Sequence, residues 1–543
     1  MITDLKVNEE RKKHYYNMGY WGHETLRDVW HVQAATFADE EYVADDQGTR
    51  LTYSKTDELA GCLASWLVEQ GVKPGDVVSF QLPTWAEFCI VYVACLKAGA
   101  VMHPLPRTFN DEDLRYAMNQ VSTVAFVCPT FFHKCSYEKQ ALDVWGDVPS
   151  LKAVAVLEKG EPSETDLPTL EDIFESYEPL SEFPEVASDD VVCILTTSGT
   201  TGKPKAALFT HNTLLFSERT FTKGTGRTKA DVMFMASPLN HATGFFHGVI
   251  SPMLLGGRTF LQQDFNPVAA VELMNAEGVT WTMGATPFVY DTLGVCDREG
   301  LKLETLELFL CGGAPVPGYM VQHAREHGFL LCEVYGSTES CPHVFVPPAE
   351  CLAWNGAWSG VPFEGVEVRV VDAEGRDVEY GVQGEEISRG PHTFVGYLND
   401  RERTDRALDD EGWFFSGDLC CHDDQGRIRI NGRKKEIIIR GGENICAREI
   451  DDNITGCPGV GAHATIGMPD DRMGERICTF VVACDGMEPK LEDVTAYLAS
   501  KHVAKRLWPE RLELIDEIPH TATGKVKRFE LAAVLAERMS AES

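Results

Sequence analysis

A run of small, hydroxyl-bearing residues followed by two lysines could bind the phosphates of a nucleotide. It reads Thr197-Ser198-Gly199-Thr200-Thr201-Gly202-Lys203-Pro204-Lys205, and an apolar strand is predicted before it over residues 191–195. Glycines let backbone N–H groups converge on an anion, and hydroxyl groups add further donors. The run is not a Walker loop, because Pro204 stands where that motif has Ser or Thr. A flexible linker would need neither the buried strand nor the lysines, so we predict a phosphate-binding loop.

The same run resembles the signature loop of the adenylate-forming enzymes, which include acyl- and aryl-CoA ligases, firefly-type luciferases and peptide-synthetase adenylation domains. It departs from most members at Ala206, where they have glycine. The sequence is similar to bacterial short- and medium-chain acyl-CoA synthetases and to cyclohexanecarboxylate–CoA ligases. The resemblance implies a ligase that joins an acid to CoA through an acyl-adenylate and uses ATP and Mg²⁺. Thr200 and Lys203 would then hold the β- and γ-phosphates, with Thr200 also near the metal.

The resemblance assigns further nucleotide contacts to motifs later in the chain. The ring of Tyr335 would stack on adenine, Thr338 would contact the α-phosphate and Glu339 would hold Mg²⁺, roles that suit these side chains. Asp418 and Arg433 match the two ribose contacts. The nucleotide-binding set implied in this way is Thr197, Ser198, Gly199, Thr200, Thr201, Gly202, Lys203, Gly312, Gly313, Ala314, Tyr335, Gly336, Thr338, Asp418 and Arg433.

Catalysis would depend on a second, mobile domain. Lys525 ends the stretch Pro519-His520-Thr521-Ala522-Thr523-Gly524-Lys525, which matches the family's inserting loop. This lysine would bridge the substrate carboxylate and the α-phosphate, where negative charge develops. Lys435 matches the hinge about which the small domain turns between the two half-reactions. After that rotation the face presented for the CoA step would contain Gly441, Gly442 and Glu443.

The acyl pocket is expected beside the nucleotide. His241 matches the residue that gates this pocket, and Ala242 stands where amino-acid-activating members have an Asp, so amino acids are disfavoured. Phe245 and Phe246 could wall an apolar tail. The expected pocket residues are His241, Ala242, Phe245, Phe246, Gly312 and Gly336. The sequence leaves linear, cyclic and aryl acids open.

Hydrophobic periodicity predicts an α/β fold. Helices and buried strands alternate before residue 184, which favours helix-covered, mostly parallel sheets. Alternating valines at residues 366–370 mark a change to a small β-barrel-like subdomain. We place a large AMP-binding domain at residues 1–433 and a small α+β domain at 434–543. In the small domain we predict strands over 462–466, 476–484 and 512–515 and a helix over 491–502.

The composition limits the classes of function that this chain can have. The chain has 543 residues, enough for at least two domains, and a formal net charge of −34, which argues against nucleic acid as a partner. The 17 cysteines show no metal-ligand spacing or disulfide pattern, which is typical of reduced thiols. We find no signal peptide and no transmembrane segment, so we expect a cytoplasmic enzyme acting on small molecules. The oligomeric state is left open.

Four other functions fit the same motifs equally well or less well. An acyl-AMP ligase that loads a carrier protein differs only in the acceptor, and a luciferase-like oxygenase is chemically possible on this fold. A peptide-synthetase module is disfavoured by the lack of room for a carrier domain. A non-catalytic nucleotide sensor would be expected to lack Lys525 or Glu339, and both are present.

Overall fold

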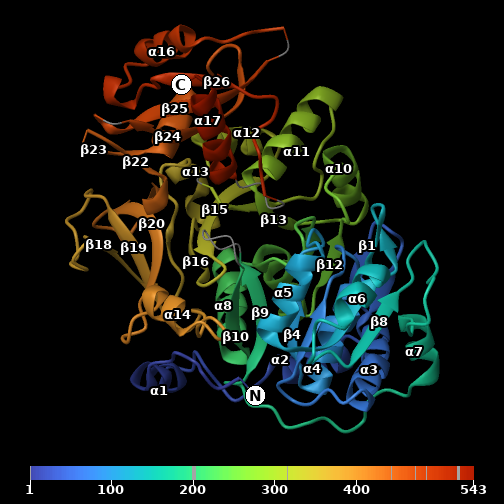
Figure 1. Ribbon diagram of the computed structural model, residues 1–543. Helices are drawn as coiled ribbons and strands as arrows, with labels where there is room; N and C mark the ends of the chain where they lie inside the picture. The colour runs from blue at the N-terminus through green and yellow to red at the C-terminus, as the bar shows by residue number, and fades with distance from the viewer. Residues whose placement is uncertain are drawn as a thin grey trace. The chain divides into compact units, whose positions relative to one another are not determined.

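The computed structural model describes residues 2–197, 204–314, 316–441, 443–470, 472–484, 486–521 and 526–542. The chain forms two compact units, each with its own hydrophobic core. The first comprises Met1–Val368 and Ser388–Phe414, and the second comprises Arg369–Ile387 and Phe415–Ser543. Figure 1 shows the elements of both units.

A nine-stranded sheet in the first unit has the order β17-β16-β15-β14-β13-β11-β12-β1-β2. The strands from β15 to β1 are parallel, and the outer pairs at both ends are antiparallel. In this order the bounds are Val361–Pro362, Cys341–Phe345, Leu330–Ser337, Leu308–Gly312, Trp281–Ala285, Val232–Met235, Arg258–Leu261, Glu41–Asp45 and Arg50–Thr52.

A six-stranded sheet in the same unit has the order β10-β9-β4-β3-β5-β8. All its pairs are parallel except β10–β9, which is antiparallel. Its bounds are Lys205–Thr210, Val191–Thr197, Val101–Pro104, Val77–Phe80, Thr123–Pro129 and Ala153–Leu157. Parallel strands buried on both faces explain the long apolar runs in this half of the sequence.

Helices cover the sheets, and several begin at a side-chain cap. Helix α4 (Glu87–Ala98) is almost entirely buried and lies against α3 (Tyr53–Glu69) beside the six-stranded sheet (Figure 1). The other helices of seven or more residues in this unit are α1 (Glu9–Asn17), α2 (Leu26–Thr36), α5 (Asp111–Val121), α6 (Tyr137–Trp145), α7 (Leu170–Ser176), α8 (His211–Thr225), α10 (Pro267–Ala276), α11 (Thr286–Glu299), α12 (Gly318–Glu326) and α14 (Arg401–Ala407).

One expected helix start was wrong by two residues. The sequence suggests Asn212 as the cap of a helix from Thr213, whereas α8 begins at His211 after a capping box made by Thr210 and Thr213. The Asn212 side chain is held by tertiary contacts: its amide donates to Asp189 Oδ1 at 2.8 Å, and its oxygen accepts from Gly22 N at 3.0 Å. A buried polar side chain with such partners is not free to cap a helix.

The second unit combines β-sheet and helix, and it contains most of the small β subdomain that the sequence analysis places within residues 1–433. The predicted small β subdomain is a four-stranded sheet of order β18-β19-β20-β21, with bounds Glu367–Val371, Gly384–Arg389, Phe414–His422 and Ile428–Arg433. The predicted strands and helix of the small domain are confirmed as β24 (Val460–Asp470), β25 (Gly474–Ala483), β26 (Arg511–Leu514) and α16 (Leu491–Ser500). The remaining elements are β22 (Ile437–Arg440), β23 (Glu443–Cys446), α15 (Ala447–Ile454) and α17 (Arg528–Glu542).

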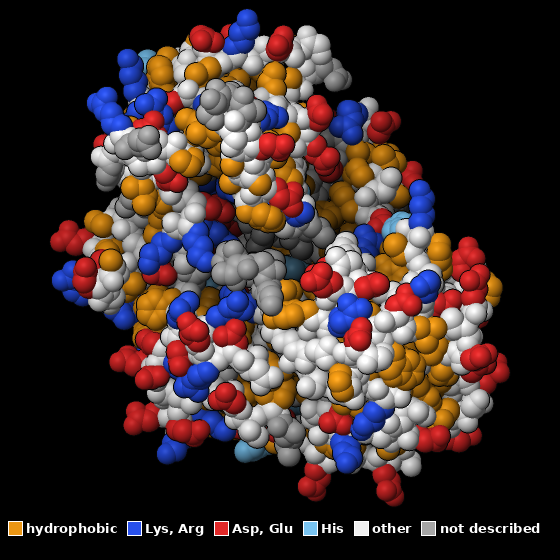
Figure 2. All heavy atoms as spheres, in the orientation of Figure 1, with side chains coloured by type: hydrophobic (Ala, Val, Ile, Leu, Met, Phe, Trp, Pro, Cys, Tyr) orange, Lys and Arg blue, Asp and Glu red, His pale blue; other side chains and the backbone are white. Residues whose placement is uncertain are grey.

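The surface reflects the acidic composition. Figure 2 shows acidic side chains spread over the face of the first unit that carries α6 and α7. The nucleotide-binding loop predicted from the sequence would therefore need basic side chains that make a local field against this background. Within the described part of the chain, no helix has the length and apolar character needed to cross a bilayer.

Candidate active site

The predicted phosphate loop joins two paired strands. β9 and β10 are antiparallel, with Lys205 opposite Thr197 and Ala206 opposite Thr196. The loop residues Ser198, Gly199, Thr200, Thr201, Gly202 and Lys203 lie outside the described residues. The Oγ1 atom of Thr197 is buried and has no hydrogen-bond partner among the residues that the structure describes. A buried hydroxyl without a partner is costly, so this atom is suited to contact a bound ligand.

A buried polar chain supports the end of β9. The Oγ atom of Ser79 lies 2.6 Å from Thr123 Oγ1 and 2.8 Å from Nδ1 of His103, whose Nε2 lies 3.0 Å from Thr196 Oγ1. His103 is fully buried in β4, and this burial lowers its pKa to about 3, so the ring is neutral. Sequence reasoning missed this chain, because a single His in an apolar strand gives no signal of its partners.

A carboxylate, a lysine and a tyrosine meet next to the same hairpin. The Tyr397 hydroxyl donates to Oε1 of Glu339 at 2.6 Å, and Lys205 Nζ lies 3.7 Å from the same oxygen. Lys205 Nζ also donates to Tyr397 Oη at 3.1 Å and lies 4.6 Å from the centre of its ring. Burial, and secondly the Glu339 carboxylate, raise the pKa of Tyr397 far above its ordinary value, so its hydroxyl remains a donor.

Backbone pairing fixes the positions of these three side chains. Leu208 N donates to Gly396 O at 3.0 Å, and Tyr397 forms a β-bridge with Ala207, so the segment around Tyr397 lies along β10. Phe394 N donates to the carbonyl of Glu339 at 2.8 Å. Only Glu339 of the three was assigned a role from the sequence. The Gly396-Tyr397 pair offered a turn signal, but nothing local revealed its partners.

The glycines at the strand ends allow close backbone approach. A Cβ on Gly336 would lie 1.9 Å from the carbonyl oxygen of Cys341, and one on Gly312 would lie 3.2 Å from the carbonyl oxygen of Val334. Gly313 has φ +86°, a conformation that favours glycine. Gly336 is therefore required by the irregular β15–β16 pairing next to Tyr335. Space for an acyl tail at Gly312 and Gly336 stays a prediction, as do the nucleotide contacts of Tyr335, Thr338, Gly312, Gly313 and Ala314.

The predicted acyl-pocket segment enters a π-helix, η1 (Thr243–Ile250). His241, just before it, is partly exposed, and its Nδ1 accepts from Thr243 N at 3.4 Å. The rings of Phe245 and Phe246 are fully buried in the core, 5.1 Å from Phe88 and 5.3 Å from Phe209. Their roles, and that of the buried Ala242, in binding an acyl chain stay predictions. Short π-helices are frequent at functional sites.

A small apolar cavity that the sequence did not indicate lies between β11, β13 and α11. The rings of Phe265 and Phe288 meet edge to face at 4.4 Å beside it. Met283 in its wall approaches within 3.7 Å of a Cβ placed on Gly312, which connects the cavity to the glycines at the strand ends. The lining residues are Phe234, Ala236, Ser237, Phe265, Met274, Thr282, Met283, Phe288, Thr292 and Phe309.

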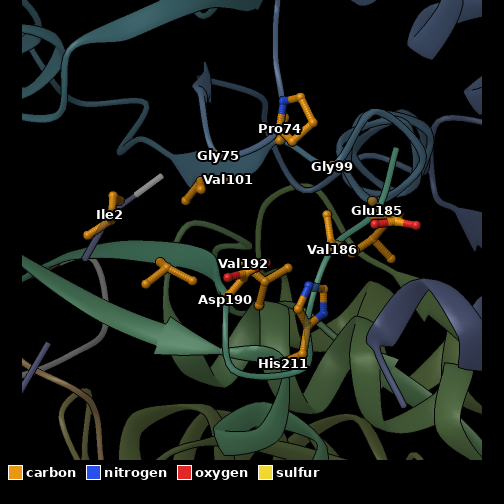
Figure 3. A pocket seen from close by; sticks show the side chains of 13 residues that line it. Ile2, Pro74, Gly75, Gly99, Val101, Glu185, Val186, Asp190, Val192 and His211 are labelled. Atoms are coloured by element: carbon orange, nitrogen blue, oxygen red, sulfur yellow. The ribbon is translucent and has the colours of Figure 1, made fainter. Parts of the chain in front are cut away.

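Another crevice contains none of the predicted site residues. Figure 3 shows the His211 imidazole directed into it below Val186, with Pro74 and Gly99 on the far side. His211 Nδ1 accepts from Leu26 N at 3.1 Å, and burial lowers the pKa of this histidine to about 3. The ring is thus a neutral acceptor for the start of α2, which is a structural role.

The second unit brings the two predicted ribose ligands together. Asp418 on β20 lies directly opposite Arg433 on β21, and Arg433 Nε is 3.0 Å from Asp418 Oδ1. Asp418 N donates to Ser416 Oγ at 3.0 Å, which fixes the backbone at this residue, and the carboxylate is nearly buried. A carboxylate and a guanidinium held in this way can accept from and donate to neighbouring hydroxyls. Binding of ribose by this pair stays a prediction.

The remaining predicted residues lie elsewhere in the second unit. Lys435 is exposed in a short 3-10 helix, η3 (Lys434–Glu436), and Gly441, with φ +61°, precedes the exposed Glu443 in the β22–β23 hairpin. Gly442 and Lys525 lie outside the described residues. His520 and Val526, on either side of the undescribed residues around Lys525, form a β-bridge. Nothing in the geometry assigns the hinge or the catalytic lysine, so both stay predictions.

Comparison with known proteins decides the family. The chain matches the family described as AMP-binding enzyme over residues 30–398, and the AMP-binding enzyme C-terminal domain over residues 449–525. The chain belongs to the AMP-binding enzyme family. This confirms the resemblance to adenylate-forming enzymes, and with it the expectation of an enzyme that acts on small molecules.

Members of this family that resemble the chain include CoA ligases. It is 39% identical to a medium-chain fatty-acid–CoA ligase of Escherichia coli (strain K12), covering 99% of this chain and 95% of that one. It is 31% identical to a feruloyl-CoA synthase of Amycolatopsis sp, covering 92% and 97%. The crystal structure of ATP-bound MatB from Rhodopseudomonas palustris has a TM-score of 0.85 at 26% identity, covering 94% and 99%. These likenesses confirm the α/β fold, and the chain spans nearly the full length of each relative.

Proposed function

We propose that the protein is an ATP-dependent carboxylic acid–CoA ligase that acts on medium-chain fatty acids through an acyl-adenylate. The observation that carries this is the cluster of Glu339, Lys205 and Tyr397 beside the hairpin of the phosphate loop. The cluster offers an anionic ligand for a cation and a lysine for phosphate at one place. Full-length likeness to a medium-chain fatty-acid–CoA ligase supports the choice of substrate.

Glu339 has the chemistry that Mg²⁺ requires. Both side-chain contacts are to Oε1, and Oε2 has no partner among the residues that the structure describes. A carboxylate oxygen is the hard ligand that Mg²⁺ prefers. Bound Mg²⁺ would offset the charge of the β- and γ-phosphates. Thr200 and Lys203 would hold the same phosphates, while Tyr397 keeps the Glu339 carboxylate oriented.

The two half-reactions would divide between different residues. In the first, Lys525 would stabilise the charge that develops as the substrate carboxylate attacks the α-phosphate and pyrophosphate leaves. Asp418 and Arg433 would hold the ribose, and Tyr335 the adenine. In the second, residues 434–543 would turn about Lys435. The face with Gly441, Gly442 and Glu443 would then admit the CoA thiol, which attacks the acyl carbonyl and releases AMP.

The acyl chain would enter the cavity next to Met283. Its lining is apolar apart from hydroxyl groups, so it offers no charge that would hold an amino group or a second carboxylate. Each added methylene that is buried should gain about 0.8 kcal/mol, or roughly fourfold in kcat/KM, until the cavity ends. kcat/KM should therefore rise with chain length and then fall, and likeness to a medium-chain fatty-acid–CoA ligase supports a maximum at medium length. His241 and Ala242 would lie at the mouth, next to the reacting carboxylate.

The test is CoA-dependent AMP formation with acids from acetate to palmitate, together with benzoate, ferulate, cyclohexanecarboxylate and several amino acids. A maximum at medium-chain acids is expected. A clear preference for an aryl or cyclic acid would show that medium-chain fatty acids are not the preferred substrates. AMP formation that requires a carrier protein and does not consume CoA would indicate an acyl-AMP ligase.

Two substitutions distinguish the cavity from the segment expected from sequence. Ala236→Leu fills the cavity and should move the preferred chain length to shorter acids with an unchanged KM for ATP. Phe246→Leu changes a side chain that packs against Phe209 in the core and should leave chain-length preference unchanged. The opposite pattern would assign the acyl pocket to the π-helix.

A further inference from the structure

Two histidines and an aspartate that have no role in the site described above converge in the first unit. Asp297 lies in the last turn of α11, and His323 and His327 lie four residues apart at the end of α12. The two helices lie next to each other (Figure 1). Among the described residues, this is the one set of three or more His, Cys, Asp or Glu side chains whose ligand atoms could share a metal ion.

The three ligand atoms already have the spacing of a metal site. His323 Nε2 lies 3.0 Å from Asp297 Oδ2, and His327 Nε2 lies 3.0 Å from Asp297 Oδ1. All three ligand atoms lie within 4.8 Å of one another. In a tetrahedral zinc site with bonds of about 2.0–2.1 Å, neighbouring ligand atoms are about 3.4 Å apart. The two His–Asp separations lie within about 0.4 Å of this value and the remaining separation is at most 4.8 Å, so side-chain movements of up to about 1.4 Å would place all three around one ion.

The surroundings favour a metal over a purely structural ion pair. Both histidines direct Nε2 at a single carboxylate, one at each oxygen, so three metal-ligating groups face one another. The side chains remain 19% to 52% exposed, which gives an ion and a water ligand access without unfolding. By contrast, His133 bonds Asp264 at 2.7 Å, but Arg107 occupies the other carboxylate oxygen and no second histidine is present there. The His133–Asp264 pair therefore has the same types of side chain but lacks a second histidine as the third metal ligand.

We propose that Asp297, His323 and His327 form a binding site for a divalent transition-metal ion, with Zn²⁺ as the expected occupant. Imidazole and carboxylate ligands suit Zn²⁺, Co²⁺ and Ni²⁺, and three protein ligands plus water complete a tetrahedral shell. The ion would join the C-terminal ends of α11 and α12. Because α11 follows β13 and α12 follows β14, the ion would stabilise the arrangement of these two βα units. It is separate from the Mg²⁺ proposed at Glu339.

The experiment measures Zn²⁺ binding to the full-length protein without an affinity tag by isothermal titration calorimetry. The starting protein carries Cys135→Ser and Cys484→Ser, because these two thiols are exposed and could bind zinc themselves. One ion per chain is expected. His323→Ala, His327→Ala and Asp297→Asn should each weaken binding by at least about tenfold. His133→Ala is the matched control and should leave the affinity unchanged.

Two further measurements report which side chains bind the metal ion and whether the ion stabilises the protein. Titration with Co²⁺ should give the intense visible absorption of a tetrahedral complex, which is lost in the His323→Ala/His327→Ala variant. Zn²⁺ should raise the thermal midpoint of the parent protein and not that of this variant. CoA ligase activity with Mg²⁺ should be the same in both, because none of the three residues belongs to the catalytic machinery.

The proposal is overturned by any of three results. These are the absence of a saturable site in the parent protein, equal affinity within twofold in the variant with all three ligands replaced, and loss of binding in His133→Ala. Circular dichroism shows that each variant is folded. The ligase reaction plays no part in these readouts, so they are independent of the proposed function.

Discussion

The contact between Tyr397 and Glu339 gives the sharpest test of the proposed nucleotide site. Tyr397→Phe removes one hydroxyl and leaves the ring, which is 4% exposed and stays packed against Phe394. The lost hydrogen bond is 2.6 Å long and runs to a carboxylate that is 12% exposed. A hydrogen bond to a charged group in such surroundings contributes about 1.5–3 kcal/mol. Among the residues that the structure describes, the 3.7 Å contact with Lys205 then remains at Oε1 of Glu339.

A backbone hydrogen bond next to this contact gives a local measure of its loss. Phe394 N donates to the Glu339 carbonyl at 2.8 Å, so exchange of this amide reports opening of the cluster. Tyr397→Phe should speed hydrogen–deuterium exchange of a peptide spanning residues 390–398 by roughly 10- to 150-fold, the factor that corresponds to about 1.5–3 kcal/mol. The KM for ATP at limiting Mg²⁺ should rise, because the carboxylate is no longer oriented.

The matched control is Tyr177→Phe. Tyr177 donates to Glu69 at 3.0 Å in the same unit, but this pair is exposed and should be worth at most about 1 kcal/mol. A double-mutant cycle of Tyr397→Phe with Glu339→Gln isolates the coupling. If the free-energy effects of the two single substitutions on exchange sum to that of the double variant within about 0.5 kcal/mol, the two side chains do not interact as described. That result would refute the reasoning.

Three other predictions follow from the same contacts and motifs. Buried His103 has its pKa lowered to about 3 against an ordinary value of about 6.5, so the unfolded state binds the extra proton. His103 should therefore lower the free energy of unfolding as pH falls below about 6.5, by roughly 1 kcal/mol between pH 7 and 5.5 in urea titrations. His103→Gln should remove this contribution. Gly336→Ala should lower the free energy of unfolding by about 1–3 kcal/mol or prevent folding, because its Cβ would lie 1.9 Å from the Cys341 carbonyl oxygen. A thermal midpoint equal to that of the wild type would contradict this. Lys525→Ala should reduce adenylation and spare thioester formation from pre-made acyl-adenylate, and Lys435→Pro should do the reverse. Equal losses in both half-reactions would argue against the hinge.

The sequence by itself determined the family, the reaction class and the order of the main elements. These are local properties: a Gly- and Thr-rich loop after an apolar strand, and the alternation of helices with buried strands, are written in consecutive residues. The strands of the small domain were also predictable, since β24, β25 and β26 each form a continuous apolar or alternating run.

Only the tertiary structure decided which side chains meet. Lys205 and Tyr397 are 192 residues apart, and pairing of β10 with the segment around Gly396 brings them together. The same holds for Asp297 with the two histidines of α12, since packing between two helices has no signature in either one. Phe246 is fully buried, and its predicted role as a pocket wall stays a prediction, because the sequence next to an aromatic residue is the same whether its ring lies in the core or lines a pocket. Contacts of this kind depend on how strands and helices pack, and a single sequence carries no record of that packing.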